Sequence, residues 1–161
     1  AVTAANVVNL INNERTRSGS APLRTDAALT RAALTRAREM NVKFDIDTRP
    51  DRRSFDTVLR DCGLVFAGAS TSGVKTPEAN ALEIFREFFN DGKTRKFMLA
   101  GEYTHLGAGM CRLGSGYYTV LLFAGGKGSG TAEPGLAGAM NELEKSLQEF
   151  EEALRQLGDS F

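Results

Sequence analysis

The chain has 161 residues, of which 42% are apolar and 25% are charged, and this composition is typical of one globular domain. The 20 Lys and Arg residues balance the 20 Asp and Glu residues, so the molecule lacks the net positive charge of nucleic-acid-binding proteins. No apolar run approaches the roughly 20 residues that cross a bilayer, so we expect no transmembrane segment.

The first part of the chain has helical periodicity. Thr3 is expected to cap a helix that runs to about Arg17, because apolar residues recur between them at helical spacing. A second helix should begin after Thr25 or Asp26 and reach about Met40. Its apolar face is built from small residues, which allows another layer of structure to approach closely.

The middle of the chain alternates short elements. A short helix is predicted from Ser54 to Gly63, followed by a strand from Leu64 to Ala67. The segment from Gly68 to Gly73 is small, hydroxylated and flanked by glycine, and it is predicted to be a loop. Thr76-Pro77 has the pattern of a helix start, and the helix is expected to run to about Asn90.

Two strands are predicted next, from Leu106 to Arg112 and from Tyr117 to Ala124, joined as a hairpin through residues 113–116. Helices, then a strand, a helix and a hairpin indicate an α+β fold in which helices cover a small antiparallel sheet. This domain is expected to occupy residues 1–124.

The composition changes after this domain. Residues 125–136 are rich in glycine and are predicted to form a linker. Residues 137–158 are predicted to form an amphipathic helix, because apolar residues alternate at spacings of three and four between residues 140 and 157. Three interpretations remain open: packing on the domain, self-association into a homo-oligomer through residues 140–157, and a contact with a partner helix or with another element of a larger parent protein.

Several segments resemble the CAP superfamily, the group of cysteine-rich secretory proteins, antigen 5 and pathogenesis-related 1 proteins. They occur in the order that bacterial members of the family show. These segments are Asn12–Leu23, Leu29–Met40, Thr48–Asp51 (similar to a His-x-Arg-Pro-Asp-Gly loop), Leu106–Gly109 (similar to Ile-Gly-Val-Gly) and Tyr117–Ala124.

The resemblance implies a three-layer α-β-α sandwich with a cleft beside the sheet. In the family this cleft holds histidines and glutamates that bind a divalent cation such as zinc. The positions that match these ligands here are Asp47, Ala69 and Thr94, and the family tryptophan is replaced by Phe85 or Phe88. One carboxylate and one hydroxyl are too few ligands for zinc or calcium, so we expect no metal and no cofactor.

Other polar residues near these motifs could contact a ligand. Arg49, Ser70 and Arg95 are the candidates that the resemblance places beside the cleft. The group of Arg49, Arg52 and Arg53 could bind a carboxylate or a phosphate. The alternative, which we favour, is a solvated loop in which these arginines pair with the acidic residues Asp45, Asp47 and Asp51.

The remaining reactive side chains predict no catalytic group. Cys62 and Cys111 are compatible with one disulfide or with two buried thiols. His105, the single histidine, lies away from the matched ligand positions and is expected to be structural or exposed.

The sequence therefore favours a non-catalytic, secreted or cell-surface module of bacterial type that binds an unidentified protein, glycan or lipid. The alternative is a hydrolase of the peptidase kind with a rebuilt cleft. Because the sandwich core uses the apolar residues, we expect no spare apolar groove for a lipid or a sterol.

Overall fold

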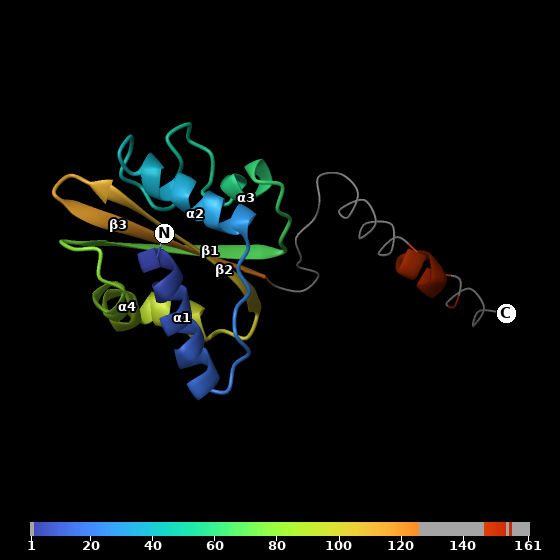
Figure 1. The fold of residues 1–161 in the computed structure, drawn as a ribbon. Helices are drawn as coiled ribbons and strands as arrows, with labels where there is room; N and C mark the ends of the chain where they lie inside the picture. The colour runs from blue at the N-terminus through green and yellow to red at the C-terminus, as the bar shows by residue number, and fades with distance from the viewer. Residues whose placement is uncertain (1, 126–146, 154, 156–161) are drawn as a thin grey trace.

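The structure is a computed structural model that describes residues 2–125, 147–153 and 155. Residues 2–125 form three layers, with the sheet in the middle (Figure 1). The elements are α1 (Val2–Arg17), α2 (Ala27–Glu39), α3 (Thr57–Asp61), β1 (Gly68–Thr76), α4 (Ala81–Asn90), α5 (Gly92–Leu99), β2 (Tyr103–Leu113) and β3 (Gly116–Gly125). This arrangement confirms the predicted α+β sandwich.

The sheet is antiparallel, and its strand order is β1-β3-β2. The hairpin between β2 and β3 turns through Gly114 and Ser115, where Gly114 has a φ of 63°. The central strand β3 is buried along almost its whole length, whereas β1 and β2 each have one free edge. Unpaired strand edges offer backbone hydrogen bonds to other chains.

Helices α2 and α3 cover one face of the sheet, and glycines in β2 let α2 approach closely. A Cβ added to Gly107 would lie 2.5 Å from the carbonyl oxygen of Leu29, and one added to Gly109 would overlap the backbone nitrogen of Leu34. Because successive strand residues point to opposite faces, both glycines point toward α2. The small face predicted for this helix therefore packs on a strand that has glycine at two successive positions facing the helix.

Helices α1, α4 and α5 cover the other face. Phe88 and Met98 are fully buried there, together with Phe123 from the central strand. Phe88 thus occupies the core, whereas Phe85 is partly buried and stacks on Phe89 with ring centroids 5.6 Å apart. The core on this side is aromatic and larger than the one beneath α2.

The prediction for the segment before α4 was wrong. The predicted loop from Gly68 to Gly73 is the first part of β1, and residues 64–67 lie outside the named strands. The small hydroxylated residues give no apolar alternation, but they pair in continuous register with β3 from Gly68–Gly125 to Thr76–Tyr117. Tertiary pairing with a strongly apolar neighbour overrides weak local propensity here.

The start of α2 agrees with the sequence prediction, whereas that of α4 differs. Asp26, one of the two predicted starts, caps α2, because its carboxylate accepts a hydrogen bond from the backbone nitrogen of Leu29. Helix α4 begins at Ala81 with Asn80 as the cap, since Thr76 is the last residue of β1.

Thr3 and Ser54, which were also predicted to cap helices, do not cap a helix in the structure. The hydroxyl of Thr3 lies inside α1 and donates to the carbonyl of Ala79 over 3.4 Å. Helix α3 follows Asp56 instead of Ser54, and it ends before Gly63, whose φ of 76° is the left-handed conformation expected there.

Only part of the C-terminal region can be compared with its prediction. Residues 147–153 are helical, as predicted, and Leu147 and Phe150 are exposed. The linker over residues 126–136 and most of the heptad pattern lie outside the described residues, so the three interpretations of residues 140–157 stay predictions. None of the helices in the described ranges is long and apolar enough to cross a membrane.

Candidate functional site

The positions that match the family's metal ligands are divided between the two faces of the sheet. Ala69 on β1 packs with the apolar cluster beneath α2 and α3. Asp47 is exposed in the loop between α2 and α3. Thr94 lies on α5 and reaches the opposite face of β1, where its hydroxyl meets that of Ser72. The structure therefore does not bring Asp47, Ala69 and Thr94 together as the lining of one cleft.

Thr94 is instead the centre of an internal hydrogen-bond chain. Its Oγ1 lies 2.6 Å from Oδ2 of Asp91 and 2.8 Å from Oγ of Ser72. A hydroxyl has one proton and a carboxylate can only accept, so Thr94 donates to Asp91 and the Ser72 hydroxyl supplies the proton of the second bond. Asp91 also accepts from the backbone nitrogen of Thr94 and thereby caps α5.

The hydrogen-bonded side chains of Ser72, Thr94 and Asp91 form neither a metal site nor a general base. The hydrogen bond from the Thr94 side chain, and then that from its backbone, lower the pKa of Asp91, which makes the carboxylate a weaker base. A threonine hydroxyl between Ser72 and Asp91 cannot act as the proton acceptor that a serine nucleophile needs. In the described part of the chain, no three His, Cys, Asp or Glu side chains are grouped so that they could hold a metal ion. The donor set at the matched positions therefore does not fit a divalent cation.

The two polar residues predicted beside the cleft also have internal partners. Oγ of Ser70 lies 2.5 Å from the hydroxyl of Tyr103, across the same face of the sheet. Arg95 is exposed, and its guanidinium lies 5.3 Å from the ring centre of Phe89. Both side chains are thus engaged within the α4 and α5 side, and they do not converge with Arg49.

Arg49 is a buried structural residue, which corrects its prediction as a ligand contact. Only 6% of Arg49 is exposed. Its Nη2 lies 3.1 Å from Glu39 and its Nη1 lies 2.7 Å from Asp61. Glu39 also accepts from the fully buried Arg36 at 2.8 Å. Hydrogen bonds from Arg49 and then from Arg53 lower the pKa of Asp61. The network ties the loop after α2 to α2 and α3.

The favoured alternative, a solvated loop of arginines and aspartates, is right in only one pair. Arg53 binds Asp51 at 2.6 Å, as predicted. Asp45 uses its Oδ1 to accept the backbone N–H groups of Asp47 and Thr48. The carboxylates that hold Arg49 come from helices that the sequence pattern did not connect to the loop.

Arg52 has a strained backbone. Its φ of 73° is left-handed, and Arg52 is the one described residue other than glycine with a positive φ. Arg52 follows Thr48–Asp51 and so occupies the place where the similar family loop has glycine. The loop keeps the glycine conformation although the glycine itself is missing.

The cysteines and the histidine have ordinary structural roles. Cys62 and Cys111 are both free thiols in the structure, which is the second of the two alternatives left open by the sequence. The Cys111 thiol donates to the carbonyl of Ala37, and burial raises the pKa of both thiols. His105 is partly exposed, and its Nδ1 lies 2.7 Å from the hydroxyl of Thr104.

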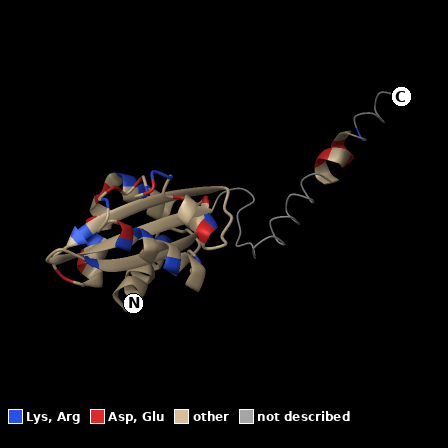
Figure 2. Ribbon diagram, turned by 90° about the horizontal axis from the view of Figure 1, so that it is seen from above, with Lys and Arg blue, Asp and Glu red and all other residues tan. Residues whose placement is uncertain are grey.

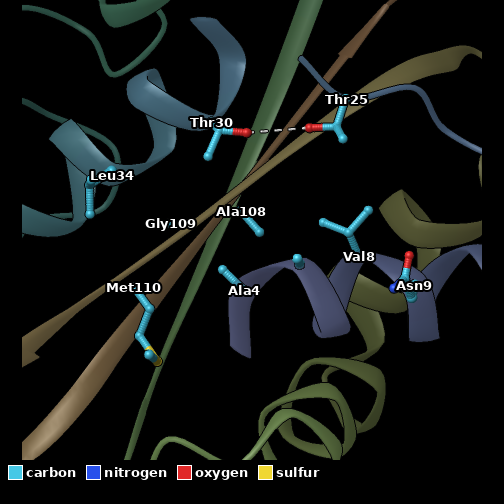
Figure 3. Close-up of a pocket in the computed structure, with 10 residues that line it drawn as sticks. Ala4, Val8, Asn9, Thr25, Thr30, Leu34, Ala108, Gly109 and Met110 are labelled. Atoms are coloured by element: carbon cyan, nitrogen blue, oxygen red, sulfur yellow. Dashed lines mark hydrogen bonds between the residues drawn. The ribbon is translucent and has the colours of Figure 1, made fainter. Parts of the chain in front are cut away.

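An apolar pocket of about 310 Å³ lies between α1 and α2, where the two helices flank the free edge of β2 (Figure 3). This pocket corrects the expectation that the core leaves no apolar groove. Small side chains make it possible, because alanine and glycine occupy the walls where α1 and β2 meet. The lining residues are Ala4, Ala5, Val8, Asn9, Thr25, Thr30, Leu34, Ala108, Gly109 and Met110.

The β2 edge in this pocket presents backbone groups that have no partner. Arg24 pairs with the start of this edge, since its nitrogen donates to Thr104 and its carbonyl accepts from Leu106, each at 2.8 Å. Every second residue of an edge strand points its N–H and C=O outward, so Ala108 and Met110 continue this row. Within residues 2–125, no backbone hydrogen bond beyond the sheet uses these groups.

The pocket could not be predicted from the sequence, because it depends on two helices and a strand edge that are remote in the chain. The Gly-Ala-Gly pattern of β2 was the available signal, since small residues in a strand indicate a close approach of other backbone. Figure 2 shows Lys and Arg mixed with Asp and Glu over the described domain, as the balanced composition predicted.

The layered fold, the buried arginine loop and the Gly-rich edge strand define a CAP-type domain. Residues 8–123 match the model of the CAP family, described as the cysteine-rich secretory protein family. Because this match covers most of the chain, the protein belongs to the CAP family.

Individual relatives agree with this assignment. The chain is 32% identical over 114 residues to the uncharacterised protein YkwD of Bacillus subtilis, and the match covers 68% of this chain but 42% of that protein. An extracellular protein with an SCP domain from Bacillus anthracis superposes with a TM-score of 0.66 and 18% identity, over 76% of this chain and 40% of the other. An outer surface protein of Borrelia burgdorferi gives a TM-score of 0.67 and 13% identity, over 79% and 95% of the two chains. The chain thus spans less than half of the first two proteins.

Proposed function

We propose that this CAP domain is a non-catalytic module, acting outside the cell, that binds an extended peptide segment of a protein partner. The observation that carries the proposal is the unpaired edge of β2 at Ala108 and Met110, which lies in the apolar pocket. Addition of a peptide strand to such an edge provides main-chain hydrogen bonds, while a pocket selects alternate side chains. Arg24 already pairs with this edge in parallel, so the peptide would extend an existing ladder.

The chemistry of the family's ligand positions supports binding over catalysis. Thr94 is engaged by Asp91 and Ser72, and Ala69 offers no donor atom. The relatives whose names place them outside the cell or on its surface support the extracellular location. The whole protein's partners remain part of the proposal, because the chain matches only a portion of YkwD.

Selection from a phage-displayed peptide library tests the proposal. Ala5 lines the pocket and is exposed, so Ala5→Arg would fill the pocket from the surface of α1. Asn6→Arg adds the same charge to an exposed neighbour that does not line the pocket. Selected peptides should bind the Asn6→Arg variant like the wild type and bind the Ala5→Arg variant about tenfold more weakly, a loss of about 1.4 kcal/mol. Equal binding by both variants, or no selected peptide, would overturn the peptide site.

Catalysis is tested with the same peptides. Mass spectrometry after prolonged incubation should recover them intact, whereas cleavage would favour the hydrolase alternative. Calorimetric titration of metal-stripped protein with zinc should give no binding heat. Tight zinc binding that Asp47→Ala abolishes would mean that the family site has been rebuilt from other ligands.

A further inference from the structure

A buried arginine without a carboxylate partner lies at the other end of the sheet. Arg15 on α1 is only 2% exposed. It donates through Nε to the carbonyl of Ala21 at 2.7 Å, and through Nη1 to Met98 at 2.8 Å and Ala100 at 3.0 Å. Among residues 2–125, no acidic side chain forms an ion pair with it. Its positive charge is therefore surrounded by dipoles but is not neutralised.

One end of this guanidinium remains available. The Nη2 group of Arg15 has no hydrogen-bond partner among the described residues. Among the described residues, two polar side-chain atoms are fully buried and lack a hydrogen-bond partner, Arg36 Nε and Thr119 Oγ1. Arg15 Nη2 is not one of these fully buried atoms. Nη2 therefore keeps some exposed surface, and Arg15 is one of the residues that line a pocket. Burial lowers the pKa of Arg15, which reflects the cost of a charge without a partner.

The pocket in front of Arg15 has a volume of about 910 Å³. Ser20, Thr104 and His105 supply polar groups to its wall, and Pro22 and Tyr103 supply apolar surface. Arg24 lines it as well and adds a second positive charge, since no ion pair of Arg24 is present in the described domain. The acids nearest to lining residues in the sequence are Glu14, Asp26 and Glu102, and none of them lines the pocket. Glu14 pairs with Arg17 at 3.6 Å.

We propose that this pocket binds the carboxylate group of a small organic acid, with Arg15 Nη2 as the buried anchor. A charged group is rarely buried unless an opposite charge pairs with it, and one carboxylate supplies the single negative charge that Arg15 lacks. The partly apolar wall suits the organic portion of such a ligand. Hydrogen bonds to a charged, desolvated guanidinium are stronger than neutral ones, so the anchor carries most of the affinity.

A variant at Gly101 offers a test that leaves Arg15 in place. Gly101 lines the pocket next to Ala100, whose carbonyl Arg15 already binds, and an added Cβ would meet no atom within 4 Å. Gly101→Glu would supply an internal carboxylate that competes with the ligand. Gly101→Gln has the same shape without the charge, and Gly92→Glu adds the same charge at another open glycine.

The measurement is a titration with acetate, benzoate and inorganic phosphate, followed by the amide NMR signals of Ser20 and Gly101 at constant ionic strength. We expect saturable shifts with the two carboxylates, with a Kd below about 10 mM, in the wild type, Gly101→Gln and Gly92→Glu proteins. In Gly101→Glu the shifts should be lost, and its Tm should exceed that of Gly101→Gln. Absence of saturation, equal binding by Gly101→Glu, or binding of phosphate but not of carboxylates would overturn the proposal. These outcomes are independent of peptide binding at β2.

Discussion

Each of the two helical layers that cover the sheet contains a buried arginine, and the two arginines differ in whether an acidic side chain balances their charge. Beneath α2 and α3, Arg49 is held by Glu39 and Asp61, and no positive charge is left over. On the α1 side, Arg15 is held only by carbonyl groups and keeps an unused donor at a pocket. A buried cation that the fold neutralises is a structural element, whereas one that the fold leaves uncompensated is a candidate for binding.

The largest effect should follow from breaking the compensated side. Arg49→Met would leave Glu39 without one of its partners, and we expect a loss of about 3 kcal/mol in the free energy of unfolding. Arg53→Met is the matched control, because this arginine pairs with Asp51 and Asp61 at the surface and its loss should cost much less stability. Urea denaturation measures both, and equal losses would show that the buried pair is not special.

The contact between α2 and the sheet should be the next most sensitive. Gly107→Ala places a methyl group 2.5 Å from the Leu29 carbonyl, so α2 must shift, and we expect a loss of about 2 kcal/mol. Gly101→Ala on the other side adds a methyl group to open space and should be close to neutral. Thermal and urea unfolding measure the stability of both variants. Equal stability of the two would contradict the close packing of α2 on β2.

A gain in stability is expected at Arg52. A left-handed backbone costs a residue with a Cβ about 1 kcal/mol or more, and glycine relieves this cost at the expense of a more flexible unfolded chain. Arg52→Gly should therefore raise the free energy of unfolding by about 0.5 kcal/mol. Arg52→Ala retains the Cβ and should show no gain. If alanine stabilised the protein as much as glycine, the effect would come from the lost charge instead.

The smallest effect should be a dependence of stability on pH through His105, which lines the pocket of Arg15. Burial lowers the pKa of His105 below its ordinary value of 6.5, so the unfolded chain binds a proton more readily than the folded one. Stability should therefore fall as the pH decreases from 7.5 through 6.5 toward 5.5, and His105→Gln should reduce this fall. An unchanged pH profile in the variant would exclude His105 as the cause.

Elements with a local signal could be predicted, and those that depend on pairing could not. The periodicity of residues 3–17 and 26–40 and the hairpin at Gly114 gave α1, α2 and the β2–β3 pair. Strand β1 has no local signal of its own, because Ser70 and Ser72 have low strand propensity and are placed by β3. The family followed from short motifs in the right order, and the family match over residues 8–123 confirms it.

By itself, the sequence determined the α+β class and the family, since both depend on residue identity and local spacing. Only the tertiary structure decided that Arg49 is neutralised while Arg15 is not, because their partners come from segments up to 85 residues apart. It also decided that α1, α2 and the edge of β2 together line an apolar pocket. Burial and charge compensation are properties of packed surfaces, and residues remote in the chain create them only when the layers assemble.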